Sequence, residues 1–196
     1  EMSASLVGSE MCIRDRFGSV CPVDHHFMRE TSVTASAEAA IWDGTEDTSW
    51  YYREHDVVVS ENGERIAIFN IRTAEELAGL AKLVRNGNNM KNTMINLVSD
   101  VTLNDTTNFD NWDEQPPANN WTAIGAVPIE APNVNVVMTI QPECRNTVFA
   151  GMFNGNGHTI SGIYSLHHNY AGLFARTSGI ITNVIVKDSY IQCINT

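Results

Sequence analysis

The sequence predicts a mostly β fold of the solenoid type, because two short motifs recur at one spacing near its end. Ala-Gly-Met-Phe at 150–153 recurs as Ala-Gly-Leu-Phe at 171–174, and Ile-Ser-Gly-Ile at 160–163 as Ile-Thr-Asn-Val at 181–184. An interval of about 20 residues suits a solenoid whose coils are short strands joined by tight corners. We therefore expect successive coils to stack with position 150 against position 171.

The same region predicts a sharp corner and a stacking register. Two Asn-Gly pairs occupy 154–157, and both residue types tolerate the positive φ that a sharp corner needs. At the expected offset, Ile160 lies against Ile181 and Phe153 against Phe174. Parallel strands about 4.8 Å apart would turn such pairs into apolar ladders inside the coil. Outward side chains and corner loops would then remain for binding.

A strong local signal predicts an α-helix near 74–85 that caps the N-terminal end of the solenoid. Thr73 and Glu76 have the spacing of a capping box, and Asn-Gly at 86–87 supplies a left-handed stop. An uncovered coil exposes unpaired amides and carbonyls, so solenoids need atypical ends. The apolar residues that share one face of this helix are Leu77, Leu80, Ala81 and Val84.

Most other segments are expected to be strands or loops. A turn is predicted at 61–64, a long Asn- and Asp-rich surface loop at 104–120, and a return to the core at 121–125. Strand-forming residues bounded by turn residues predict strands at 41–45, 49–52, 66–69, 94–97, 100–103 and 133–140.

The domain boundaries follow from an unusual N-terminal sequence. Residues 1–16 match the translation of a transposase sequencing adapter with its flanking primer and index, so we expect them to be an adapter-derived artefact in a metagenomic fragment. Residues 17–33 are an undetermined tail: either an ordinary linker or a chimeric join that replaces the apolar core of a signal peptide. The β-helix domain is expected at 34–196, and its end inside a repeat pattern predicts truncation at the C-terminus.

Composition excludes several classes of partner. The net charge is −11, and Lys and Arg do not cluster, which argues against nucleic acid and anionic membrane surfaces. No apolar run approaches the roughly 20 residues of a membrane span, so no membrane insertion is expected. Beyond the adapter match, Cys21, Cys144 and Cys193 form neither a disulfide framework nor a metal-binding spacing. This acidic, Asn- and Thr-rich composition suits an extracellular bacterial protein.

An ordered series of motifs resembles bacterial surface proteins with GLUG-type repeats. The series spans about 41–193. The segments that resemble the repeat itself are 171–174 and 179–184. The preceding motifs that match lie at 73–84, 97–103, 121–125 and 151–160.

The resemblance implies a right-handed parallel β-helix on a large secreted or wall-attached protein. Such proteins include adhesin-like proteins and the stalks of some IgA-cleaving proteases. The segments 104–120 and 126–147 are longer than the resemblance predicts, so they are interpreted as decorations or binding loops.

Candidate ligand contacts lie in the 104–120 loop. Trp112 could stack on a sugar, and Asp110 and Asp113 flank it. A calcium site built from these carboxylates with Asp100 and Asp105 would use a spacing that matches no cation motif. No metal and no cofactor are therefore expected.

No catalytic residue is expected either. His158 follows a glycine corner and is predicted to cap a turn, while Lys187 and Asp188 are strand neighbours whose side chains point to opposite faces. The sequence therefore favours a non-catalytic surface adhesion or display module with host or cell-surface glycans or proteins as partners. The alternative is part of a carbohydrate-active β-helix enzyme or the stalk of a secreted protease.

Overall fold

The computed structural model describes residues 5–7, 10–12, 40–126, 147–167 and 170–193. The chain divides into two compact units, Glu1–Ala37 and Glu38–Thr196. In the first unit, strands β1 (Ser5–Val7) and β2 (Glu10–Cys12) pair antiparallel. The strand expected at 133–140, Cys21 and Cys144, and the tail at 17–33 lie outside the described residues.

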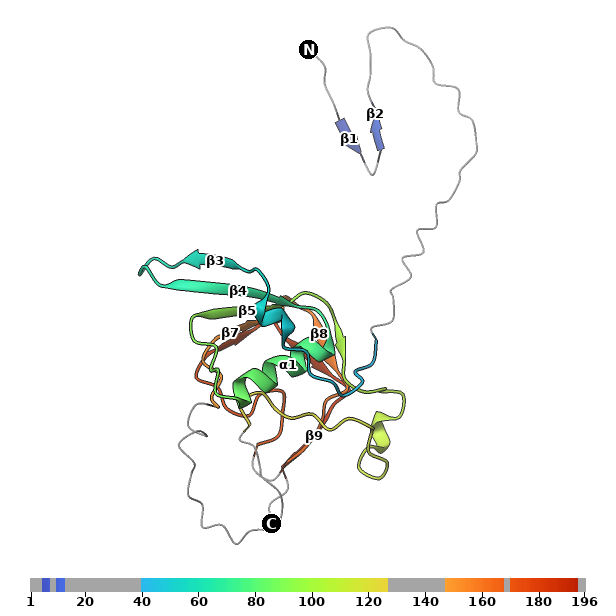
Figure 1. Ribbon diagram of the computed structural model, residues 1–196. Coiled ribbons are helices and arrows are strands. Elements are labelled where there is room, and N and C mark those ends of the chain that lie inside the picture. The colour runs from blue at the N-terminus through green and yellow to red at the C-terminus, as the bar shows by residue number, and fades with distance from the viewer. Residues whose placement is uncertain (1–4, 8–9, 13–39, 127–146, 168–169, 194–196) are drawn as a thin grey trace, which may run out of the picture. The chain divides into compact units, whose positions relative to one another are not determined.

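The second unit is mostly β with one α-helix among its described residues, as the sequence predicted (Figure 1). Its sheets have the orders β10-β7-β5-β4-β3, β11-β8-β6 and β12-β9, and every pair is parallel except β3 with β4. The strands are β3 (Asp56–Val59), β4 (Arg65–Ile71), β5 (Thr93–Leu97), β6 (Val101–Thr102), β7 (Met152–Asn154), β8 (Thr159–Ser161), β9 (Tyr164–His167), β10 (Ile180–Thr182), β11 (Ile185–Lys187) and β12 (Tyr190–Cys193).

Three consecutive strands, β7, β8 and β9, pair in order with the next three, β10, β11 and β12. Ile180 lies opposite Met152, which is a longer interval along the chain than the one between positions 150 and 171. The expected offset is therefore wrong. Phe153 pairs with Ile181, and Ile160 pairs with Val186.

The error arises because the two Ala-Gly motifs occupy different places in the pairing. Phe153 belongs to β7, whereas Phe174 forms an isolated parallel bridge with Ile124. The two phenylalanine rings still meet, with centroids 5.4 Å apart, but they are not pairing partners. The residue that stacks on Gly151 is Gly179, where an added Cβ would lie 1.9 Å from the Gly151 carbonyl oxygen.

Amide side chains link the strands on their outer side. Asn96 Nδ2 donates to Asn70 Oδ1 over 3.2 Å, between β5 and β4. Asn183 Nδ2 donates to Asn154 Oδ1 over 3.2 Å, near the paired strands β10 and β7. The predicted corner is also present, because Asn156 and Gly157 both have positive φ. Asn70 and Asn96 are direct pairing partners, so the bond between their side chains follows from the observed register.

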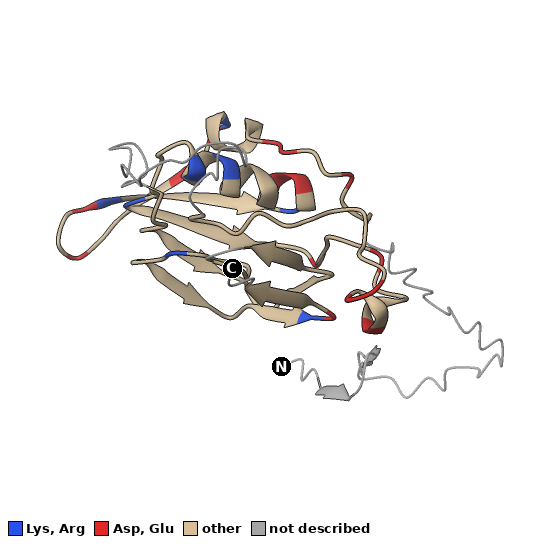
Figure 2. Ribbon diagram, turned by 90° about the horizontal axis from the view of Figure 1, so that it is seen from below, with Lys and Arg blue, Asp and Glu red and all other residues tan. Residues whose placement is uncertain are grey.

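Helix α1 (Ala74–Arg85) confirms the strongest local prediction. The Thr73 hydroxyl accepts from the backbone N–H of Glu76 over 3.2 Å. At the other end, Gly87 has φ 96° and its N–H donates to Val84 O over 3.0 Å. All four predicted face residues are buried. Figure 2 shows the helix at one end of the strands. Its role as the cap of a solenoid stays a prediction.

The segment at 41–53 covers this helix, and part of it was predicted wrongly. Ser49–Tyr52 forms a 3-10 helix, η1, instead of a strand. Its register is set by tertiary contacts: Trp50 is 2% exposed, and its indole N–H donates to Glu76 O over 3.0 Å. Gly79 permits this approach, since a Cβ there would lie 1.8 Å from Asp47 O.

The 104–120 loop is closed at its base by two asparagines. Asn104 Nδ2 donates to Gly162 O over 2.9 Å, and its Oδ1 accepts from Asn119 N over 3.0 Å. Asn119 Nδ2 in turn donates to Trp42 O over 2.6 Å. The loop also contains the short 3-10 helix η2 (Phe109–Asn111). It therefore starts and ends at one fixed point on the strands.

Replacing Gly79 by Ala tests the contact between the helix and the covering segment. In a free helix this change stabilises by roughly 0.5–1 kcal/mol, because glycine loses more backbone entropy on folding. Here the added methyl meets Asp47 O at 1.8 Å, so the segment must move. We expect a lower free energy of unfolding, by about 1–3 kcal/mol, in urea titrations. Unchanged or increased stability would show that the segment does not lie on the helix.

Candidate functional site

The loop residues that the sequence singled out differ in accessibility. Trp112 is 2% exposed and meets Tyr164 edge to face, with ring centroids 6.0 Å apart. Its ring therefore packs the loop onto β9 and offers no face to a sugar, so its prediction as a stacking surface is wrong. Asp110 and Asp113 are exposed. Their role as ligand contacts stays a prediction.

Asp100 and His158, both considered as candidate functional residues, do lie together, but their contacts hold two strands in place. Asp100 Oδ1 accepts from Thr159 N over 2.9 Å and lies 3.2 Å from His158 Nδ1. The bond from the Thr159 backbone N–H lowers the pKa of Asp100 below its usual 3.8; slight burial opposes this, and His158 and Lys187 add to it. The carboxylate thus joins the turn between β5 and β6 to the start of β8.

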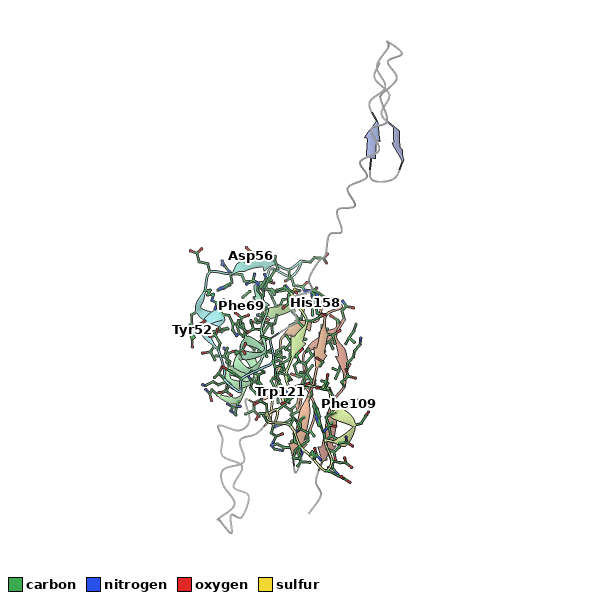
Figure 3. All side chains as sticks on the ribbon, turned by 90° about the vertical axis from the view of Figure 1, so that its right-hand side faces the viewer. Tyr52, Asp56, Phe69, Phe109, Trp121 and His158 are labelled. Atoms are coloured by element: carbon green, nitrogen blue, oxygen red, sulfur yellow. The ribbon has the colours of Figure 1, made fainter. Side chains whose placement is uncertain are left out.

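A larger feature lies elsewhere, in an open cleft of about 660 Å³ beside η1, β3 and β4. Figure 3 shows Tyr52, Asp56 and Phe69 in one part of the second unit, away from Phe109 of the 104–120 loop. The residues that line the cleft are Trp50, Tyr52, Arg53, Glu54, His55, Asp56, Ile68, Phe69, Asn70 and Arg72.

Aromatic rings build one side of the cleft. Phe69 is buried, with Tyr51 stacked on it at 5.2 Å and His55 tilted over it at 4.4 Å between centroids. Trp50 meets Phe69 edge to face at 5.4 Å. Tyr52 stands at the rim and is 77% exposed, so its ring is available to a ligand. Such packed pairs fix ring orientation and add to the stability that burial gives.

The cleft opens where β4 loses its antiparallel neighbour. Strand β3 pairs with β4 only as far as Ile68, opposite Asp56. Ala67 N donates to Asn92 O and Ile71 O accepts from Val98 N, so these alternate residues bond toward β5. Since bonding direction alternates along a strand, the backbone N–H and C=O of Asn70 face the cleft side. No described residue pairs with them there.

Some charged side chains that line the cleft form hydrogen bonds or ion pairs within the protein, and others form none. Arg53 is paired within the protein: its Nη1 binds Glu76 Oε1 at 3.1 Å and its Nη2 binds Ser49 Oγ at 2.9 Å. Among the described residues, neither Glu54 nor Asp56 has a side-chain hydrogen bond or ion pair, and the Arg72 guanidinium has none either. The cleft therefore presents two free carboxylates and one free cation beside an exposed aromatic ring.

Sequence analysis missed this cleft for identifiable reasons. Ser-Trp-Tyr-Tyr at 49–52 was interpreted as a strand, whereas the structure forms the 3-10 helix η1 there, with Tyr52 exposed at the rim of the cleft. Strand β3 was not predicted, because the valine run at 57–59 lacks the apolar–polar alternation of a half-buried strand. The structure exposes all three valines. The run of aromatic residues at 50–52 next to alternating charges was the available signal.

No group of three or more His, Cys, Asp or Glu side chains within the described ranges could hold a metal ion. The carboxylates weighed for calcium are thus not gathered into such a group. In the same part of the chain, no helix is both long and apolar enough to cross a membrane. The chain matches no protein-family model, no curated protein and no solved structure.

The Asp100 contact predicts a defined pH dependence. A carboxylate whose pKa is lowered on folding contributes stability above its unfolded pKa, and loses it as pH falls through the folded pKa. Asp100→Asn should therefore destabilise the protein at about pH 5, and the difference from wild type should shrink below about pH 3.8. Urea titrations across this range, with Asp110→Asn as a control for charge loss, measure it. A difference that persists at about pH 2 would contradict the assignment.

Proposed function

We propose that this chain is a non-catalytic adhesion or display module built on a right-handed parallel β-helix of a secreted or wall-attached bacterial protein. The observation that carries the proposal is the ordered parallel pairing of β7, β8 and β9 with β10, β11 and β12. Consecutive strands that pair in order are what stacked coils of a solenoid require. The resemblance of several sequence motifs to GLUG-type repeats implies the same architecture.

The stacked strands suit a display function because buried residues stabilise the fold while exposed residues remain available for binding. Apolar residues such as Ile95, Phe153 and Ile160 are fully buried and hold the strands together. Polar groups and loops are left outside, where the cleft opens and the 104–120 loop is fixed at its base by Asn104 and Asn119. Binding surfaces on a rigid scaffold lose less conformational entropy when they meet a partner. Host or cell-surface glycans and proteins are the partners we propose.

A paired screen separates this function from the enzymatic alternative. The chain is incubated with pectins, host glycans and peptidoglycan, and both released reducing sugars and unsaturated products are measured. The same ligands and host surface proteins, immobilised, are tested for retention of the chain. We expect retention without turnover. Turnover that Asp110→Ala or Asp113→Ala abolishes, while Asp105→Ala does not, would establish a carbohydrate-active enzyme instead.

A further inference from the structure

We propose that the cleft beside η1, β3 and β4 is a binding site for an uncharged saccharide unit. This inference rests on the proposed display function and gives that function a site and a ligand class. The cleft is lined by Tyr52, Glu54 and Asp56 and by residues near the end of β4, from Ile68 to Asn70. None of the residues that the sequence predicted as ligand contacts lines it.

The aromatic rim fits the apolar face of a sugar ring. A pyranose has one face of C–H groups and an edge of hydroxyls, so it needs an aromatic surface and polar groups at right angles to it. Tyr52 is 77% exposed, and its ring leans edge to face on Tyr51, with centroids 5.5 Å apart. Tyr51 is in turn stacked on Phe69. The exposed ring is therefore held by a packed aromatic cluster, which lowers the entropic cost of binding.

The polar groups of the cleft fit hydroxyls. Glu54 and Asp56 are free acceptors, and the Asn70 carbonyl on the open edge of β4 adds a third. A hydroxyl both donates and accepts, so sugar hydroxyls can bind these acceptors and also accept from the Asn70 N–H or from Arg72. Hydrogen bonds to ionised groups are the stronger kind. An apolar ligand would leave these groups without partners, which is unfavourable.

The charge of the cleft argues against the other ligand classes. Its free carboxylates outnumber its one free guanidinium, Arg72, among the described lining residues, and the chain carries a net charge of −11. An acidic sugar or a nucleic acid would be repelled. An extended peptide would need a longer open strand edge, since β-strand addition depends on successive main-chain hydrogen bonds. Among the described residues between Ile68 and Ile71, only Asn70 faces the cleft with free backbone groups.

Titration with soluble tetrasaccharides of N-acetylglucosamine, mannose and galactose tests the site. Binding is measured by saturation-transfer NMR, and Kd by titration of backbone amide shifts. We expect at least one of them to bind with shifts in Tyr52, Asn70 and Arg72. Tyr52→Ala and the double change Glu54→Gln with Asp56→Asn should each raise Kd about tenfold or more. Because these side chains are exposed, both variants should unfold at the temperature of the wild type.

Matched controls use residues outside the cleft. Tyr170→Ala removes a tyrosine that is 44% exposed, and Glu61→Gln removes an exposed carboxylate in the 61–64 turn. Neither should change Kd. Tetragalacturonate and a lysine-rich octapeptide serve as competing ligand classes and should bind more weakly than the uncharged sugar.

The outcomes separate this inference from the function on which it rests. If the Tyr52 and Glu54–Asp56 variants bind sugar as the wild type does, the cleft is not the saccharide site, and the proposed display function still stands. Tighter Tyr52-dependent binding of tetragalacturonate or the peptide overturns the uncharged-saccharide class. Failure of all three sugars to bind overturns the inference, while display remains supported if immobilised host proteins still retain the chain. Cleavage of a bound sugar overturns the non-catalytic function itself.

Discussion

The arrangement of the cleft depends on one glutamate in the first turn of helix α1. Glu76 is 5% exposed and joins three segments. Its Oε2 accepts from Arg72 N at the end of β4 over 2.7 Å, and its Oε1 pairs with Arg53 at 3.1 Å. Its backbone carbonyl accepts from the Trp50 indole at 3.0 Å. Removing a partner from such a buried group leaves donors unsatisfied, so Glu76 fixes how η1 sits relative to β4.

Ion pairs further along the helix support the same packing. Glu46 contacts Arg85 at 2.7 Å and Lys82 at 3.2 Å. Its partial burial raises the pKa, but the bonds from Arg85 and Lys82 outweigh this and lower it. The covering segment is thus attached to the helix at Glu46, at the Gly79 contact and at Glu76. These three attachments place the aromatic cluster at the open edge of β4, so helix α1, the covering segment and the wall of the cleft form one packed structure.

Local signals in the sequence predicted more than distant ones. The helix was predicted because its capping box and its glycine stop act within a few residues. The predicted interval between stacked coils was wrong because the similar motifs at 150–153 and 171–174 occupy different places in the strand pairing. Only the strand register reveals this difference. Trp112 was misjudged, since its burial depends on Tyr164, far along the chain. The cleft was missed because 50–56 and 68–72 come together only through Glu76, which bonds to Trp50, Arg53 and Arg72.

Hydrogen exchange in the Glu76→Ala variant tests most directly whether Glu76 holds the cleft together. Without its carboxylate, the Arg72 amide loses its acceptor and Arg53 its buried partner. We expect exchange of the Arg72 amide to accelerate about tenfold or more, because its acceptor is gone. The Trp50 indole keeps its acceptor, the Glu76 backbone carbonyl, but its exchange should also accelerate because η1 loses the Arg53–Glu76 ion pair that holds it. Amides of Ile95 and Leu97 in β5 should keep their protection, and Glu75→Ala should leave all of these rates unchanged. Equal exchange at Arg72 and Trp50 in Glu76→Ala and wild type would contradict the account.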